Sequence, residues 1–161
     1  MRKPFKELSD NARIWIYPAS RKISNIEVLE IKKLCDDFTD QWTAHNKSLV
    51  ASVDIPYNRF IVLGLDTDFN AASGCSIDSS VHFIQSLEKK YDIIFLDKMN
   101  VTFKQGEYLT YKSLNDFKIM VKKGSVNNNT IVFNNLVNDI AGYRHNWEIP
   151  MKDSWHSRFI S

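Results

Sequence analysis

This sequence of 161 residues has few cysteines, almost no excess of charge of one sign and no long apolar run. The two cysteines, Cys35 and Cys75, are too few for a disulfide framework and lack the paired spacing of a zinc site. We therefore expect two reduced thiols and a cytoplasmic protein. The 21 basic and 19 acidic residues leave a formal charge of +2, which provides no long-range field to attract nucleic acid or an anionic membrane.

The sequence also has no apolar segment long enough to span a membrane. The longest apolar run, residues 60–65, is far too short to cross a bilayer, and residues 1–7 lack the apolar stretch of a signal peptide. We therefore predict no membrane insertion and no export by a standard signal. The 43% hydrophobic and 25% charged residues are typical of a globular protein.

The first strand and the first helix can be read from residue spacing. Residues 13–17 alternate in the two-residue period of a strand, and Ser24 with Glu27 forms a capping box that predicts the start of a helix. Apolar residues then recur at steps of three and four, which predicts one buried helix face. The residues expected on that face are Val28, Ile31, Cys35, Phe38 and Trp42.

Two further strands and a second helix follow. Residues 49–55 alternate, residues 56–58 supply a turn, and residues 59–65 are apolar on both faces, which predicts a sheet covered on both sides. A loop of small residues, 70–75, precedes a second helix that is expected to begin near Ser76.

This order predicts an α+β protein with a ferredoxin-like β-α-β-β-α-β core in residues 1–98. Either 93–96 or 101–103 would supply the last strand. Residues 99–161 are predicted to be a small ββαβ appendix, with a turn at Gly106 and a helix capped by Ser113. Its aromatic tail is expected to pack on the core, and the rings of that tail are Trp147, Trp155 and Phe159.

Several segments together resemble a family of short bacterial proteins that are often labelled "ABC transporter ATPase". The resemblance spans nearly the whole chain, and the family has no established activity. The segments that carry it are residues 5–17, 41–45, 73–81, 132–136 and 154–155.

The residues themselves argue against an ATPase. A phosphate-binding P-loop needs glycines, a lysine and a following Ser or Thr, so that backbone amides and an ammonium surround the phosphates. No Gly-Lys pair occurs in the sequence. We therefore predict no ATP binding and no cofactor.

A second resemblance covers residues 114–147, which look like the end of a bacterial GYF-like module. Such modules are thought to be interaction domains, so the resemblance implies a binding role. The Gly-Pro-aromatic part of that pattern has no counterpart, and residues 105–108 stand in its place.

Cys75 is the first candidate for chemistry. A thiol at a helix N-terminus feels the positive end of the helix dipole, and Gly74 beside it would let a ligand approach the backbone. The amides that follow could hold an anion. His45 could act as a base if it lies nearby. A buried, unreactive cysteine in a tight turn explains the same pattern. The predicted binding residues are Ser73, Gly74, Cys75, Ser76 and Asp78.

Two other kinds of site have weaker signals. Asp66, Asp68, Asp78 and His82 could converge on one end of the sheet, but their spacing matches no established metal loop, so no metal is expected. Trp15 and Tyr17, with Arg13, would share one strand face, as aromatics do in RNA-recognition modules. The strand at 59–65 lacks the matching basic-aromatic signature, so no nucleic acid is expected.

The leading hypothesis is a small cytoplasmic binding or adaptor protein that uses residues 73–80 and the His45 region to recognise a protein or a small anionic ligand. The alternative is a thiol-dependent enzyme with Cys75 as nucleophile.

Overall fold

The computed structural model describes residues 1–160, which form a mixed α+β protein with antiparallel sheets. The chain divides into two compact units. The first contains Met1–Leu96 and Asn138–Ile140, and the second contains the remainder of the described chain. Within residues 1–160, no helix combines the length and the apolar character needed to cross a bilayer.

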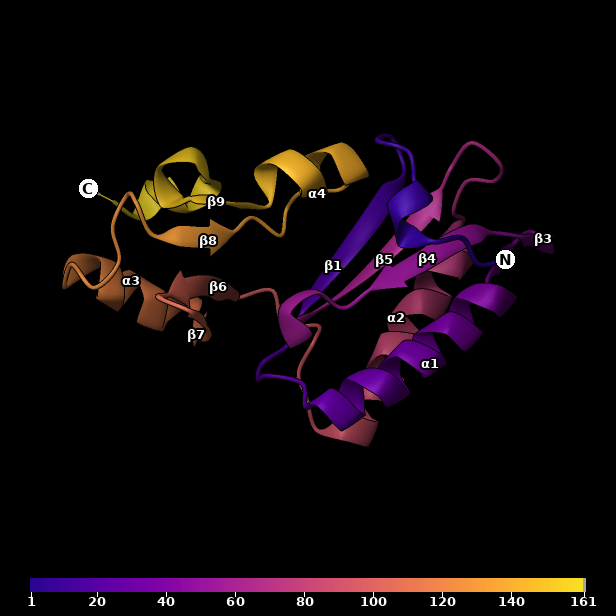
Figure 1. The fold of residues 1–161 in the computed structure, drawn as a ribbon, viewed down its shortest axis with the longest axis horizontal. Helices are drawn as coiled ribbons and strands as arrows, with labels where there is room; N and C mark the ends of the chain where they lie inside the picture. The colour runs from indigo at the N-terminus through magenta and orange to yellow at the C-terminus, as the bar shows by residue number, and fades with distance from the viewer. Residues whose placement is uncertain (161) are drawn as a thin grey trace. The chain divides into compact units, whose positions relative to one another are not determined.

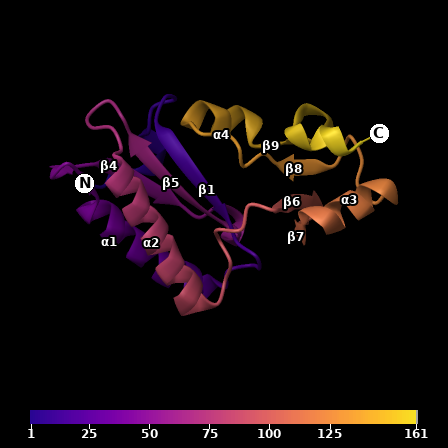
Figure 2. The same cartoon turned by 180° about the vertical axis from the view of Figure 1, so that it is seen from behind.

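The first unit is built on a three-stranded antiparallel sheet in the order β1-β5-β4 (Figure 1). These strands are β1 (Arg13–Pro18), β4 (Val50–Asp54) and β5 (Phe60–Asp66), and the 3-10 helix η2 (Pro56–Asn58) joins β4 to β5. Two long helices, α1 (Asn25–Gln41) and α2 (Gly74–Tyr91), lie on one face of the sheet (Figures 1 and 2). All seven residues of β5 are buried, which confirms the prediction of a strand covered on both faces.

The opposite face of the sheet is covered by the 3-10 helix η1 (Phe5–Glu7) and by Leu8. Gly64 in β5 makes this possible because it has no side chain. A Cβ atom at Gly64 would collide with the Leu8 side chain and would lie 3.4 Å from the ring of Phe5. The side chain of Leu8 therefore occupies the space that a side chain at position 64 would fill.

The predicted capping box at the start of α1 is confirmed. The Ser24 hydroxyl accepts a hydrogen bond from the Glu27 amide at 3.2 Å, and the Ser24 amide donates to the Glu27 carboxylate at 3.0 Å. Cys35 lies fully buried on the inner face of the helix, as predicted, and burial raises the pKa of its thiol to about 12. Phe38 is only half-buried, and its ring stacks on Phe83 of α2 with 4.5 Å between centroids.

The prediction for the last strand of this sheet is wrong. Residues 93–96 are not a strand, and residues 101–103 belong to the other sheet. Asp92 ends α2 in a left-handed conformation, and the carboxylate of Glu88 then accepts hydrogen bonds from the amides of Phe95 and Leu96 at 2.7 and 3.0 Å. These bonds hold residues 95 and 96 at the end of α2. Ile94 contacts the chain just after β1, where its carbonyl accepts from the Ser20 amide at 3.0 Å, but the segment forms no strand there.

A segment distant in sequence occupies the outer edge of β1. Residues 138–140 run antiparallel to it, with the Ile14 amide donating to the Asn138 carbonyl and the Ile140 amide donating to the Ala12 carbonyl, both at 3.0 Å. The sheet of the first unit therefore has three strands in the order β1-β5-β4, with a single bridge to residues 138–140 beside β1.

The second unit contains a four-stranded antiparallel sheet in the order β7-β6-β8-β9. Gly106, with φ of 61°, forms the turn between β6 and β7, and the Ser113 hydroxyl accepts a hydrogen bond from the Asp116 amide at 3.1 Å, as the caps and turns in the sequence predicted. The elements after residue 99 are β6 (Asn100–Gln105), β7 (Tyr108–Ser113), α3 (Leu114–Lys122), β8 (Ile131–Phe133), α4 (Ile140–Asn146), β9 (Glu148–Pro150), η3 (Met151–Asp153) and η4 (Trp155–Phe159). Ile140, the first residue of α4, still belongs to the first unit.

The aromatic tail packs within the second unit. The ring of Trp147 lies 4.8 Å from that of Phe133, and Phe159 packs edge-on against the buried Phe117. His156 is 1% exposed, stacks on Trp155 at 3.9 Å, and has its Nδ1 2.6 Å from the Ser154 hydroxyl. Burial lowers the pKa of His156 to about 4, so the ring is neutral at physiological pH.

Candidate functional site

The residues singled out in the sequence lie at the start of α2, but the helix begins earlier than predicted. Ser73, not Ser76, is the N-cap: its hydroxyl accepts from the Ser76 amide at 3.1 Å, while the Ser76 hydroxyl accepts from the Ser73 amide at 2.7 Å. Ser76 thus takes the reciprocal role usually held by Glu or Gln. Gly74 and Cys75 belong to the first helical turn and not to a loop.

Access at this helix start is uneven. Gly74, Cys75 and Asp78 are exposed, whereas Ser76 is buried and its carbonyl accepts a hydrogen bond from the indole nitrogen of Trp42 at 2.8 Å. Cys75 is therefore accessible to solvent, while the hydrogen bond from Trp42 fixes the buried side of the helix start.

His45 lies in the turn of a short hairpin that sequence reasoning did not find, formed by β2 (Thr43–Ala44) and β3 (Lys47–Ser48). It is exposed and has a positive φ of 50°. Among residues 1–160 no hydrogen bond joins His45 to Cys75. A Cys-His catalytic pair stays a prediction.

The acidic residues near the end of β5 do not assemble a metal site. Asp66 is buried, and its carboxylate lies 2.9 Å from the ammonium of Lys3, whose hydrogen bond lowers the pKa of Asp66. Within the described part of the chain, no three His, Cys, Asp or Glu side chains come together as metal ligands would. Asp66, Asp68, Asp78 and His82, considered from the sequence, are thus not brought together as metal ligands among the described residues.

The two aromatic residues of β1 pack against other side chains of the first unit. Tyr17 is buried in the core, and Trp15 packs edge-on against Trp42 at 5.8 Å with the guanidinium of Arg13 over its ring at 4.6 Å. Both rings belong to the apolar cluster that includes residues of the helices. They do not form the open aromatic face that base stacking needs.

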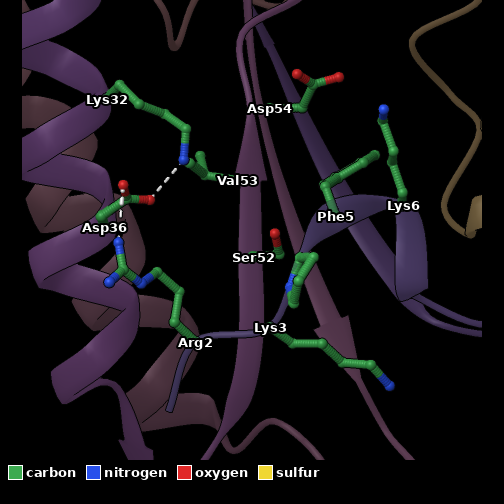
Figure 3. A pocket seen from close by; sticks show the side chains of 10 residues that line it. Arg2, Lys3, Phe5, Lys6, Lys32, Asp36, Ser52, Val53 and Asp54 are labelled. Carbon is green, nitrogen blue, oxygen red and sulfur yellow. Dashed lines mark hydrogen bonds and ion pairs between the residues drawn. The ribbon is translucent and has the colours of Figure 1, made fainter.

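A pocket of about 470 Å³ opens at the outer edge of the first sheet, and sequence reasoning did not identify it (Figure 3). Residues from α1, from the C-terminal half of β4 and from the N-terminal segment surround it. Figure 3 shows β4 between Lys32 on the side of α1 and Lys6 on the side of η1. The lining residues are Arg2, Lys3, Pro4, Phe5, Lys6, Lys32, Asp36, Ser52, Val53 and Asp54.

The pocket lining is cationic, with four basic side chains against two carboxylates. Arg2 and Lys32 share the carboxylate of Asp36, at 3.0 and 2.6 Å, and both cations remain about half exposed. Lys6 is exposed, and among the described residues no ion pair includes it. The ammonium of Lys3 is the one directed to the buried Asp66. Arg2 also lies 3.5 Å from the carboxylate of Asp40, so among the described residues Lys6 is the pocket cation that takes part in no ion pair.

No family model, curated protein or solved structure matches this chain. The two resemblances noted in the sequence stay predictions. Functional inference therefore rests on the geometry of the start of α2 and of the pocket beside β4.

A local signal for the pocket was present in the sequence. Arg2, Lys3 and Lys6 place three cations around Pro4. Only the fold shows that the N-terminal segment lies against β4 and brings these cations to Lys32. A basic cluster near one end of a chain otherwise indicates no more than a solvated surface.

Proposed function

We propose that the protein is a small binding or adaptor protein, and that the pocket beside β4 recognises an anionic group. The observation that carries the proposal is the set of accessible cations in the pocket lining: Arg2 and Lys32 are half-exposed around the carboxylate of Asp36, and Lys6 is exposed at the opposite wall. Carboxylate or phosphate oxygens would accept charge-assisted hydrogen bonds from these groups. No P-loop supports ATP hydrolysis in this sequence.

Neutralising two pocket lysines is expected to weaken the binding of a small dicarboxylate. We expect titration of the isotopically labelled protein with succinate at low salt to shift the amide signals of Lys6, Lys32 and Val53. In the double variant Lys6→Gln, Lys32→Gln the affinity should fall about tenfold, because each lost ammonium removes a charge-assisted contact.

The matched control is the double variant Lys33→Gln, Lys47→Gln. It removes the same two charges from exposed positions of the first unit that do not line the pocket, and its affinity should change little. Equal weakening in both variants would show unspecific attraction. Shifts confined to Gly74, Cys75 and Asp78 would move the recognition site to the start of α2, as the sequence predicted.

The alternative function is a thiol-dependent enzyme, and the exposure of Cys75 is the observation that favours it. The substitution Cys75→Ser separates the two functions. We expect it to leave succinate binding unchanged, because Cys75 does not line the pocket. Rapid modification of Cys75 by iodoacetamide at neutral pH, much faster than that of a free cysteine, would favour the enzyme instead.

A further inference from the structure

The outer edge of β4 carries an incomplete ladder of backbone hydrogen bonds. The N-terminal segment pairs with β4 only at Ala51, whose amide donates to the Met1 carbonyl and whose carbonyl accepts from the Lys3 amide, both at 2.9 Å. The chain then turns at Pro4 into η1, where the Glu7 amide donates to the Pro4 carbonyl at 3.0 Å. The added strand therefore ends after Lys3.

Val53 is the next residue of β4 whose backbone faces outward. Ala51 directs its amide and carbonyl away from β5, and in an antiparallel pair alternate residues present these groups on the same edge. Among residues 1–160, no backbone hydrogen bond reaches Val53 from the outer side. After β4, the Ile55 amide donates to the Asp54 carboxylate at 3.0 Å, so this amide is not available to an added strand.

A single open position suits an antiparallel strand. In such a pair one residue can donate to and accept from the same residue opposite, so both outward groups of Val53 would be satisfied by one residue of the incoming segment. This mode of peptide binding by strand addition derives affinity from the main chain and specificity from side chains on the two faces.

The walls of the pocket define those side chains. Neighbouring residues of an extended strand point to opposite faces. One side chain of the added segment would therefore face Lys32 and Arg2 beside α1, and the next would face Lys6 beside η1 (Figure 3). Two adjacent acidic residues would place one carboxylate near Lys32 and Arg2 and the other near Lys6.

We propose that the pocket receives an extended acidic segment of a partner protein, which adds a strand to β4 at Val53 and places adjacent carboxylates against Lys32 and Lys6. This inference rests on the proposed anion-binding function and adds the class of ligand. The exposed ammonium of Lys6, the half-exposed side chains of Arg2 and Lys32, and the unpaired edge at Val53 are the observations that favour this occupant.

The test compares the succinate probe with a capped hexapeptide, acetyl-Thr-Val-Glu-Glu-Val-Thr-amide. We expect the peptide to bind at least about tenfold more tightly than succinate, and to slow hydrogen exchange of the Val53 amide. Methylation of both glutamate backbone nitrogens removes the donors but keeps the charges, and should reverse that gain. A Gln-Gln version should also lose it.

The outcomes separate the two proposals. If succinate binds in the pocket but the peptide binds no more tightly, or if backbone methylation has no effect, strand addition is wrong and the anion site stands. If neither probe shifts the pocket amides, the proposed function itself fails. Peptide-induced shifts located only at the start of α2 or in the second unit would also overturn the inference.

Discussion

The substitution Gly64→Val should lower the free energy of unfolding of the first unit by about 3 kcal/mol, at the upper end of the usual cost of overpacking a core. The new side chain would enter space that Leu8 occupies and would press on the ring of Phe5. Leu8 is 2% exposed, so displacing it returns a buried aliphatic group to water. Urea titrations followed by amide signals of β1 and β5 would measure the loss.

The same substitution at Gly74 is the matched control. A Cβ atom there meets no heavy atom within 4 Å, and Gly74 lies in the first turn of α2 without a positive φ. Gly74→Val should therefore change stability by only a few tenths of a kcal/mol, the size of a helix-propensity difference. Similar unfolding midpoints for the two variants would show that η1 does not pack over Gly64.

Gly64→Val also connects the fold to the proposed function. Phe5 and Lys6 belong to η1 and line the pocket, so a shift of η1 would displace one of its two cationic walls. Succinate binding should weaken in Gly64→Val and persist in Gly74→Val. The reverse pattern would favour the start of α2 as the recognition surface.

Acidification from pH 7 to pH 5 should destabilise the second unit by about 2 kcal/mol through His156 alone. Burial lowers its pKa from 6.5 to about 4 in the folded state. As the pH falls below 6.5 the unfolded chain therefore binds a proton that the folded unit excludes, and unfolding becomes easier. Below about pH 4 both states are protonated, and the further loss from this group ends.

The control for this prediction is His156→Asn, which cannot titrate and can still reach the Ser154 hydroxyl. The variant should be less stable at pH 7, because the ring stacked on Trp155 is lost, but its stability should vary less between pH 7 and 5. Urea titrations that follow amide signals of β6 and β8 would measure how the free energy of unfolding changes with pH in each protein. Parallel slopes for the two proteins would mean that His156 is protonated in the folded unit.

The candidate site shows how far local sequence patterns reach. The sequence predicted a capped helix start beside Cys75, because a cap needs only a hydroxyl and an amide three residues apart. It left open whether this cysteine is buried, and the structure shows that it is exposed. The prediction placed the cap at Ser76 and not at Ser73, because the two serines have the same side-chain chemistry and each hydroxyl accepts from the amide of the other in the folded helix start.

The pocket beside β4 could not be found in this way. Its walls come from the N-terminal segment, α1 and β4. The carboxylate of Asp36 in α1 forms ion pairs with Arg2 of the N-terminal segment and with Lys32 of α1. The helical spacing relates Lys32 to Asp36 four residues later, but no spacing rule relates either residue to Arg2, whose position follows from its pairing with Ala51.

The sequence by itself determined the features that depend on neighbours along the chain. The cap at Ser24, the cap at Ser113 and the turn at Gly106 each rest on a few adjacent residues, and the fully apolar 60–65 run marked a strand with two covered faces. Only the tertiary structure decided which segment lies beside β1, because Glu88 holds residues 95 and 96 at the end of α2 and residues 138–140 take that edge. It likewise decided that the edge of β4 stays open at Val53, since the N-terminal segment turns away at Pro4 toward the space above Gly64.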